Sequence, residues 1–230
     1  MAKSAIMFGS IGVLVESSDL QRRAYNQALQ EAGLPWTWDR ETYSDLLLQS
    51  GGKDRLAHLA AATGTPLSQD RIDSIHARKT DLACAMMASE GASLRPGVAA
   101  LVQIAKSRGM KLAFVTTTNQ QNIDAVFAAT KGALSPGDFD YIASIASVAR
   151  GKPNPDVYLA ALDMLGTRPA EALAVEDTAV SVMAAARAGI AVVATPGALT
   201  AGQDFWQADL VVETLAEGNE VNPKVLAMLG

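Results

Sequence analysis

The chain alternates short apolar runs with longer segments in which apolar residues recur at helical spacing. Most of the runs are continuously apolar, which is typical of parallel strands covered on both faces by helices. We predict strands at Ala5 to Phe8, Lys111 to Val115, Tyr141 to Ser144, Ala172 to Val175, Ala191 to Ala194 and Leu210 to Val212. We predict crossover helices at Val98 to Ser107, Gln121 to Ala129, Asp156 to Leu165, Val180 to Ala188 and Pro223 to Leu229. The pattern therefore predicts an α/β protein built on one doubly wound parallel sheet.

One long stretch, residues 17–93, breaks this alternation and contains no convincing strand. Its helical patterns include Ala24, Ala28 and Leu29, and the series Ile72, Ile75, Lys79 and Leu82. The stretch follows the first predicted strand, and open α/β sheets bind ligands outside the carboxyl ends of their strands. We therefore expect a core of residues 1–16 and 94–230, and an all-helical cap of residues 17–93 over the binding site.

Composition and charge narrow the classes of protein. The chain has 230 residues, 49% of them hydrophobic, and its net charge of -5 gives no positive field for binding nucleic acid. The single Cys84 cannot form an intramolecular disulfide, and no metal-ligand cluster accompanies His58 and His76. The apolar run within Met1 to Ile6 is too short for a signal peptide or a membrane span. We expect a cytoplasmic protein that binds neither nucleic acid nor membranes and holds any anion locally.

Polar residues follow three of the predicted strands. The first group is Thr116 to Asn119, whose hydroxyl and backbone N–H groups suit a phosphate oxygen. A simple helix cap by Thr118 or Asn119 explains the same residues, and the local sequence alone favours that interpretation.

The second group is the loop from Arg150 to Asp156, in which we expect Asn154 to cap a helix that begins at Pro155. Lys152 lies in this loop beside a glycine and a proline, although a lone loop lysine more often only meets solvent. The third group is the pair Glu176 and Asp177, which suits Mg²⁺ or the start of a helix. Each signal is weak alone, and their convergence on one edge of the sheet favours a binding site.

Taken together, these motifs resemble the haloacid dehalogenase superfamily of Mg²⁺-dependent phosphatases and phosphomutases, over the whole chain. Within it the chain is most similar to the CbbY-like group, which includes the xylulose-bisphosphate phosphatase and lies near beta-phosphoglucomutase. Further similarity lies in Ser50-Gly51-Gly52-Lys53-Asp54-Arg55, in Trp38-Asp39 and in the segment from Thr195 to Phe205. The resemblance implies a Rossmann-like core with an inserted helical cap.

The resemblance also implies roles for individual residues. Thr116 corresponds to the second-motif hydroxyl, and Lys152 to the lysine that anchors the phosphate. Asp177 corresponds to the metal-binding acid, with Glu176 beside it. Lys53 and Arg55 would be cap residues that reach a sugar phosphate.

The first motif departs from the family pattern. Where the family has two aspartates, this chain has Gly9 and Ile11, so the positions of the nucleophile and of the general acid/base carry no carboxylate. Ile11 keeps only its backbone carbonyl, which is a metal ligand in the family, and we expect weakened Mg²⁺ binding. Loss of a hydrolase nucleophile costs about 10⁶-fold in kcat, so ordinary turnover is not expected.

Three functions remain open from the sequence. The first is an impaired family member that binds a small phosphorylated metabolite or a protein partner. The second is a sugar-phosphate phosphatase with an unconventional nucleophile, for which Ser10 would need to reorient and find a base, while His58 and His76 lie in the predicted cap. The third is a structural or regulatory protein whose pocket is vestigial.

Overall fold

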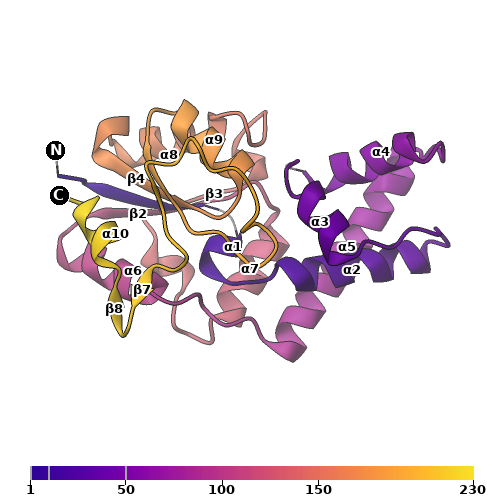
Figure 1. The fold of residues 1–230 in the computed structure, drawn as a ribbon, viewed down its shortest axis with the longest axis horizontal. Helices are drawn as coiled ribbons and strands as arrows, with labels where there is room; N and C mark the ends of the chain where they lie inside the picture. Colours follow the sequence, from indigo (N-terminus) through magenta and orange to yellow (C-terminus); the bar gives the residue numbers. More distant parts are fainter. Residues whose placement is uncertain (1, 10, 50) are drawn as a thin grey trace.

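The computed structural model describes residues 2–9, 11–49 and 51–230 and contains a six-stranded sheet flanked by helices (Figure 1). The strands of this sheet are β1 (Ala5–Phe8), β2 (Lys111–Val115), β3 (Tyr141–Ala143), β4 (Ala172–Glu176), β5 (Ala191–Ala194) and β6 (Leu210–Val211). All their pairings are parallel, and the order β3-β2-β1-β4-β5-β6 places β1 between β2 and β4. The predicted α/β class with a parallel, Rossmann-like sheet is confirmed.

The helices of the core follow the predicted crossovers closely. They are α1 (Ile11–Leu14), α6 (Val98–Ser107), α7 (Gln120–Ala129), α8 (Asp156–Leu165), α9 (Ala179–Arg187) and α10 (Pro223–Ala227). Short 3-10 helices lie at Pro136–Asp138, Ile145–Ser147 and Pro169–Glu171. Among the described helices, none is both long and apolar enough to span a bilayer.

One local prediction was wrong, and one small element was not predicted. Helix α8 begins at Asp156 with Pro155 as its N-cap, and the Asn154 amide instead donates a hydrogen bond to the Gly151 carbonyl. The turn at residues 217–219 joins a small antiparallel hairpin, β7 (Ala216–Glu217) and β8 (Glu220–Val221), which the sequence did not indicate. Two-residue strands carry too few positions for a periodic pattern.

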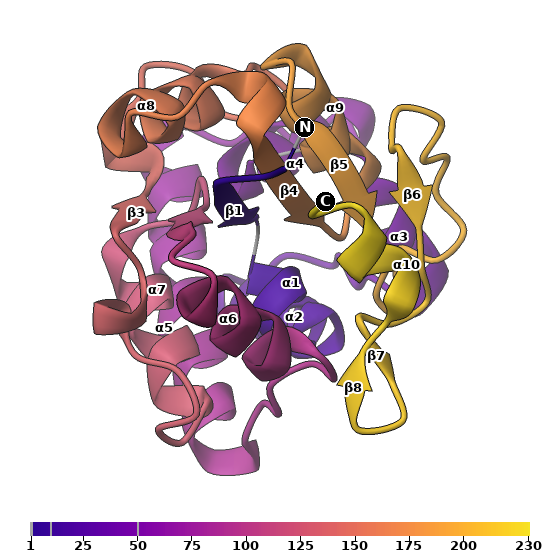
Figure 2. The same cartoon turned by 90° about the vertical axis from the view of Figure 1, so that its left-hand side faces the viewer.

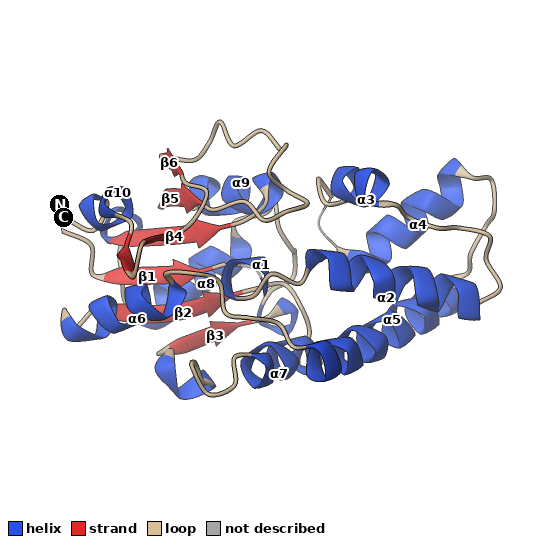
Figure 3. Ribbon diagram, turned by 60° about the horizontal axis from the view of Figure 1, so that its bottom comes forward, coloured by secondary structure: helices blue, strands red, loops and turns tan. Residues whose placement is uncertain are grey.

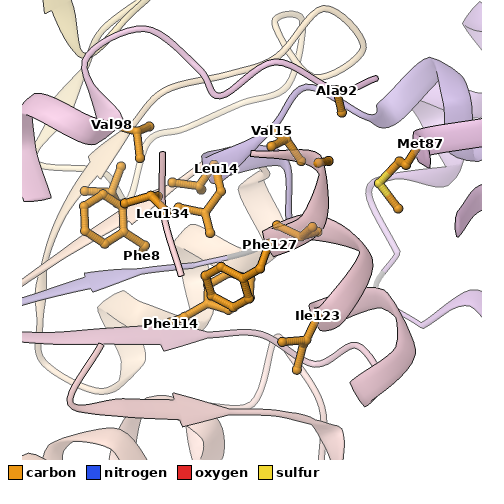
Figure 4. Close-up of a cluster of buried hydrophobic side chains, with 14 of the residues drawn as sticks. Phe8, Leu14, Val15, Met87, Ala92, Val98, Phe114, Ile123, Phe127 and Leu134 are labelled. Atoms are coloured by element: carbon orange, nitrogen blue, oxygen red, sulfur yellow. The ribbon is translucent and has the colours of Figure 1, made fainter. Parts of the chain in front are cut away.

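The sheet buries both of its faces, because successive strand residues point to opposite sides. Ile6 and Phe8 pack in the cluster that includes residues of α6, α7 and α10, whereas Ala5 and Met7 pack in the cluster of α8 and α9. Figure 2 shows these two helical layers above and below the strands. On the first face, Phe114 meets Phe127 of α7 edge-on, with ring centroids 5.8 Å apart (Figure 4). Continuous apolar strands therefore mark a sheet that is covered twice.

In their described part, residues 17–93 contain helices joined by turns and loops, and no strand. The helical patterns of this stretch predict this. These helices are α2 (Ser18–Glu31), α3 (Arg40–Leu46), α4 (Gly52–Ala62) and α5 (Gln69–Glu90), and Figure 3 shows them gathered beyond one end of the strands. The chain leaves the core and returns to it at neighbouring points, since Val15 and Leu94 form an isolated antiparallel bridge. The helical segment thus lies beyond the carboxyl ends of the strands, where α/β sheets bind ligands.

Arg95 connects helix α1 with the loop after β5 at this end of the sheet. Its guanidinium donates hydrogen bonds to the carbonyls of Gly12 (2.9 Å), Thr195 (2.7 Å) and Pro196 (2.9 Å). A further bond reaches the Thr195 hydroxyl at 3.1 Å. One side chain therefore joins helix α1 to the loop after β5.

We expect Arg95→Met to lower the free energy of unfolding by about 3 kcal/mol, because it leaves several partly buried carbonyls without a charged donor. Chemical denaturation of the whole protein measures this change. The control is Arg108→Met, which replaces an exposed arginine at the end of α6. Equal effects of the two substitutions would contradict the role given to Arg95.

Candidate functional site

A cavity of about 610 Å³ lies between the carboxyl ends of the strands and the helices of residues 17–93. From the core, its lining includes Ile11, Gly12, Thr116, Thr117, Thr118, Lys152 and Asp177. From the helical segment, its lining includes Gln21, Tyr25, Tyr43, Lys53, Arg55, His76 and Lys79. The structure therefore brings Thr116, Lys152, Asp177, Lys53 and Arg55, all singled out in the sequence, to one cavity.

The strand end of the site is organised by a buried ion pair. The Lys152 ammonium donates to Oε1 of Glu176 at 2.6 Å and to the Val115 carbonyl at 3.1 Å. The Tyr158 hydroxyl donates to the same Glu176 oxygen. Lys152 is 5% exposed and Glu176 is 0% exposed, so the pair is screened from solvent. Lys152 is thus fixed at the sheet edge, and its strongest partner is a carboxylate of its own chain.

Gly9 is what makes room for this pair. A Cβ atom built on Gly9 would lie 2.1 Å from Cδ of Glu176 and 2.2 Å from its Oε1. The Glu176 carboxylate therefore occupies the space that any side chain at position 9 would enter. An aspartate at that position requires Glu176 to move.

Burial, together with the charge of Glu176, raises the pKa of the Tyr158 hydroxyl well above its usual value. The phenol therefore stays protonated and keeps its proton directed at the carboxylate. Because Tyr158 and Lys152 both donate to Glu176, that carboxylate has two donors at the end where the sequence expected metal and phosphate.

The second acid, Asp177, lies one residue further on and lines the cavity. Its Oδ2 atom is 1.8 Å from the point where a Cβ on Gly12 would lie, so this glycine also accommodates a carboxylate. Among residues 2–9, 11–49 and 51–230, no group of three or more His, Cys, Asp or Glu side chains is placed to hold a metal. Glu176 would have to loosen its bond to Lys152 to serve beside Asp177 as one of the Mg²⁺ ligands that the resemblance implies.

The turn after β2 combines a cap with a lining of hydroxyls. Asn119 caps α7 by accepting from the Asn122 N–H at 3.0 Å, which confirms the cap interpretation for this residue. Thr116 is buried, and its hydroxyl oxygen accepts from the Thr118 N–H at 3.2 Å. The Thr118 hydroxyl accepts from the Asn122 amide at 2.8 Å. The capping of α7 thereby holds these hydroxyls along the cavity wall.

Two cations of the helical segment, Lys53 and Arg55, line the cavity and differ in their partners. Lys53 is exposed and forms an ion pair with Asp73 at 2.9 Å. Arg55 donates to the Gln49 carbonyl at 3.1 Å, and its guanidinium lies 5.9 Å from the centroid of the Tyr43 ring. Within the described ranges, Arg55 has no carboxylate within ion-pair distance.

Lys79 of α5 is the cation that sequence reasoning missed as a site residue. It is 5% exposed, and its ammonium donates to Oε1 of Gln21 at 3.0 Å and lies 4.9 Å from the centroid of the Tyr25 ring. No ion pair to Lys79 occurs in the described part of the chain. One signal was available: Lys79 falls on the same predicted helical stripe as Ile72 and Ile75, where a solvated lysine is out of place.

Positive charge accumulates at this end of the cavity. Burial, together with the nearby Arg55, lowers the pKa of Lys79 to about 8. Burial also lowers the pKa of His76 to about 4, and the cations Lys79, Lys53 and Arg55 contribute to that shift. His76 is therefore neutral near pH 7, whereas Lys79 remains mostly charged.

The two candidate bases and the candidate serine are not brought together as a catalytic group. His58 is exposed on α4 and is not among the residues that line the cavity. His76 lines the helical end of the cavity, packed near Gly52. Ser10 lies outside the described residues.

A family model described as haloacid dehalogenase-like hydrolase matches residues 4–189. The chain is 40% identical to Protein CbbY of Rhodobacter capsulatus over 216 residues, which is 94% of this chain and 95% of that protein. It is 38% identical to the plasmid-encoded CbbY of Cupriavidus necator, over 96% of this chain and 89% of that protein.

Solved structures give the same likeness. The crystal structure of CbbY from Rhodobacter sphaeroides in complex with phosphate has a TM-score of 0.88 at 38% identity, covering 100% of this chain and 99% of that one. A CbbY variant from that organism, in complex with xylulose-(1,5)bisphosphate, has a TM-score of 0.89 at the same identity and coverage. These similarities confirm the expected resemblance to the CbbY-like group, in a family that generally uses Mg²⁺.

The low pKa of Lys79 predicts that the free energy cost of burying this side chain depends on pH. Its folded pKa of about 8 lies below the ordinary value of 10.5, so between these values the unfolded chain binds more protons. Stability at this position therefore rises with pH across that interval, by about 3 kcal/mol. Denaturation of the native protein and of Lys79→Met at about pH 7 and about pH 10 measures this, with the native protein gaining relative to the variant. A difference that does not change with pH would contradict the assignment.

Proposed function

The chain belongs to the haloacid dehalogenase-like hydrolase family, and from this premise we propose that it binds a phosphorylated sugar without ordinary hydrolysis of the phosphate ester. The CbbY structures to which it is similar contain phosphate and xylulose-(1,5)bisphosphate, which supports a ligand of this class. The observation that carries the second half of the proposal is Gly9, where the Glu176 carboxylate fills the space of the missing side chain.

The chemistry explains why this substitution matters. Hydrolysis through a covalent intermediate needs a nucleophile that reaches phosphorus and an acid that protonates the departing oxygen. Gly9 and Ile11 supply neither. Glu176 does not replace them, because it is 0% exposed and accepts bonds from Lys152 and Tyr158. The chain therefore lacks both side chains that this reaction requires, the nucleophile and the general acid/base.

Binding of a phosphorylated ligand requires cations and hydrogen-bond donors but no nucleophile. We assign the phosphate-binding role to the cavity residues Thr116 and Lys152 of the core and Lys53 and Arg55 of the cap. Each is a hydroxyl or a cation that lines the cavity, which supports this role. The cap is the helical segment 17–93, inserted into the core of residues 1–16 and 94–230.

We propose weak Mg²⁺ binding, through Asp177, Glu176 and the backbone carbonyl of Ile11. Asp177 and Ile11 line the cavity, whereas the Glu176 carboxylate accepts a hydrogen bond from Lys152. A cation of this kind keeps several waters and needs only one or two protein carboxylates, which supports a weakly held ion. The proposed location remains the cytoplasm, on the sequence argument alone.

Two phosphatase assays test the proposal, on a panel of phosphosugars with Mg²⁺. We expect the native protein to show no Mg²⁺-dependent turnover above the buffer rate, because about 10⁶-fold of the rate depends on the missing nucleophile. Clear turnover by the pure native protein would sink the proposal and favour an unconventional nucleophile.

The matched variant is Gly9→Asp/Ile11→Asp, which restores both carboxylates. We expect it to gain activity if Glu176 can leave the space beside position 9, since the displaced group is the end of a flexible side chain. No gain would mean that the losses extend beyond the first motif. If the native protein binds no phosphosugar and tolerates Lys152→Ala, the pocket is vestigial.

A further inference from the structure

We propose that the loop after β5, residues 195–209, fixes the two walls of the cavity relative to each other, with Ser44 and Gln203 as positioning residues. Ser44 lies on α3 in the helical wall, and Gln203 holds the start of α9 in the core wall. The inference rests on the proposed function where it concerns ligand affinity. Its structural part does not depend on a ligand.

The loop after β5 is long and irregular, yet much of it is buried. It connects β5 to β6 without a helix or strand, whereas most connections in compact domains have about 4–6 residues. Thr195, Leu199 and Thr200 are all buried. Within the loop, the Thr200 hydroxyl accepts from the Gly197 N–H at 2.8 Å, and the Gln203 N–H donates to the Thr200 carbonyl at 3.0 Å. Because burial and internal hydrogen bonds limit local opening, the loop holds its attachments at fixed positions.

The first attachment of the loop is to the helical segment. The Ser44 hydroxyl donates to the Leu199 carbonyl at 2.7 Å, and the neighbouring Tyr43 is buried and lines the cavity. Figure 3 shows α3 on the side of the helical segment away from α5 and α7. On the side of α5, the Gln121 amide of α7 donates to Asp81 at 2.8 Å. The helical segment therefore meets the core on two flanks, and its α3 flank rests on the loop.

The second attachment is to the linker that enters the helical segment. Oε2 of Glu16 accepts from the Ala198 N–H at 3.0 Å, and Oε1 accepts from the Ser18 N–H at 3.1 Å. A Cβ on Gly197 would lie 2.2 Å from Oε2 of Glu16, so glycine is what allows this close approach. The carbonyl that Ser44 binds therefore belongs to a backbone that is itself anchored beside the linker.

The third attachment is to the start of α9. Oε1 of Gln203 accepts from the Ala179 N–H at 2.8 Å, which satisfies one of the N–H groups that a helix start leaves unpaired. The Thr178 hydroxyl caps the same helix by accepting from the Ser181 N–H at 3.3 Å. Thr178 and Ser181 line the cavity, whereas Gln203 is not among the lining residues. Gln203 therefore holds the core wall from behind.

These attachments predict a coupling between two residues that bond to different parts of the loop. A ligand that touches both walls binds most tightly when their spacing is set in advance, because less binding free energy is then lost to ordering. Release of either attachment lets the walls move separately, so release of the second adds little. The effects of Ser44 and Gln203 on affinity are therefore not independent.

A double-mutant cycle on the whole protein tests this coupling, with affinity for ribose 5-phosphate measured by isothermal titration. We expect Ser44→Ala and Gln203→Met each to weaken binding by about fivefold, as the loss of one hydrogen bond does. The double variant should also lose about fivefold, whereas independent effects multiply to about 25-fold. Gln203→Glu keeps an acceptor at the helix start and should bind within about twofold of the native protein.

The matched control is Ser89→Ala in the helical segment. Ser89 is exposed, and its hydroxyl donates to the Met86 carbonyl of its own helix at 3.3 Å. This substitution should change the affinity by less than about twofold, and its effect should multiply with that of Gln203→Met. Native affinity in both Ser44→Ala and Gln203→Met, or effects that multiply in their double variant, would overturn the inference.

Hydrogen exchange of the Ala179 amide in the unliganded protein tests the structural part. We expect Ser44→Ala to speed this exchange by about fivefold and Ser89→Ala to leave it unchanged, because only Ser44 bonds to the loop. If the native protein binds no phosphosugar and Ser44→Ala still speeds exchange, the proposed function fails and the role of the loop stands. An unchanged exchange rate in Ser44→Ala means that this inference is wrong, whatever the ligand does.

Discussion

The buried ion pair between Lys152 and Glu176 is the interaction on which the rest of the site depends. It joins the loop before α8 to the end of β4, and the Tyr158 hydroxyl supports it from α8. Such a pair is stable only while both partners are present, because either charge alone would be stranded away from water. The pair occupies its position because residue 9 has no side chain. The absence of a side chain at position 9 therefore lets Lys152 and Glu176 bind each other at the sheet edge.

This pairing sets the distribution of charge in the whole cavity. The core contributes hydroxyls and one cavity-lining carboxylate, while the helical segment contributes the cations that have no carboxylate partner. The contacts that hold the core and the helical segment together do not involve these charged groups. They comprise the packing of the doubly covered sheet, the bridge between Val15 and Leu94, and the bonds of Arg95 to α1 and to the loop after β5. The fold of the family therefore does not depend on which charged side chains line the cavity.

Much of the fold could be predicted from the sequence because its strands are short, continuously apolar and followed by helical patterns. Ala5–Phe8 and Lys111–Val115 match the prediction at both ends. The proposal that Gly9 and Ile11 replace two family aspartates also comes from the sequence, through the resemblance of the surrounding motif. The direction of the Glu176 side chain could not be predicted, because it depends on the empty space beside β1 and on donors from α8 and the loop that precedes it. Lys79 was read as part of a buried helical stripe, because periodicity identifies a face and not the cavity that this face borders.

The most direct test of the account is a crystal structure of the native protein with ribose 5-phosphate bound. The account predicts that the intact phosphosugar lies in the cavity between the strand ends and the helical segment, and that Glu176 remains hydrogen-bonded to Lys152 beside Gly9. Cleavage of the phosphate ester in the bound ligand, or a Glu176 carboxylate moved away from position 9, would contradict it.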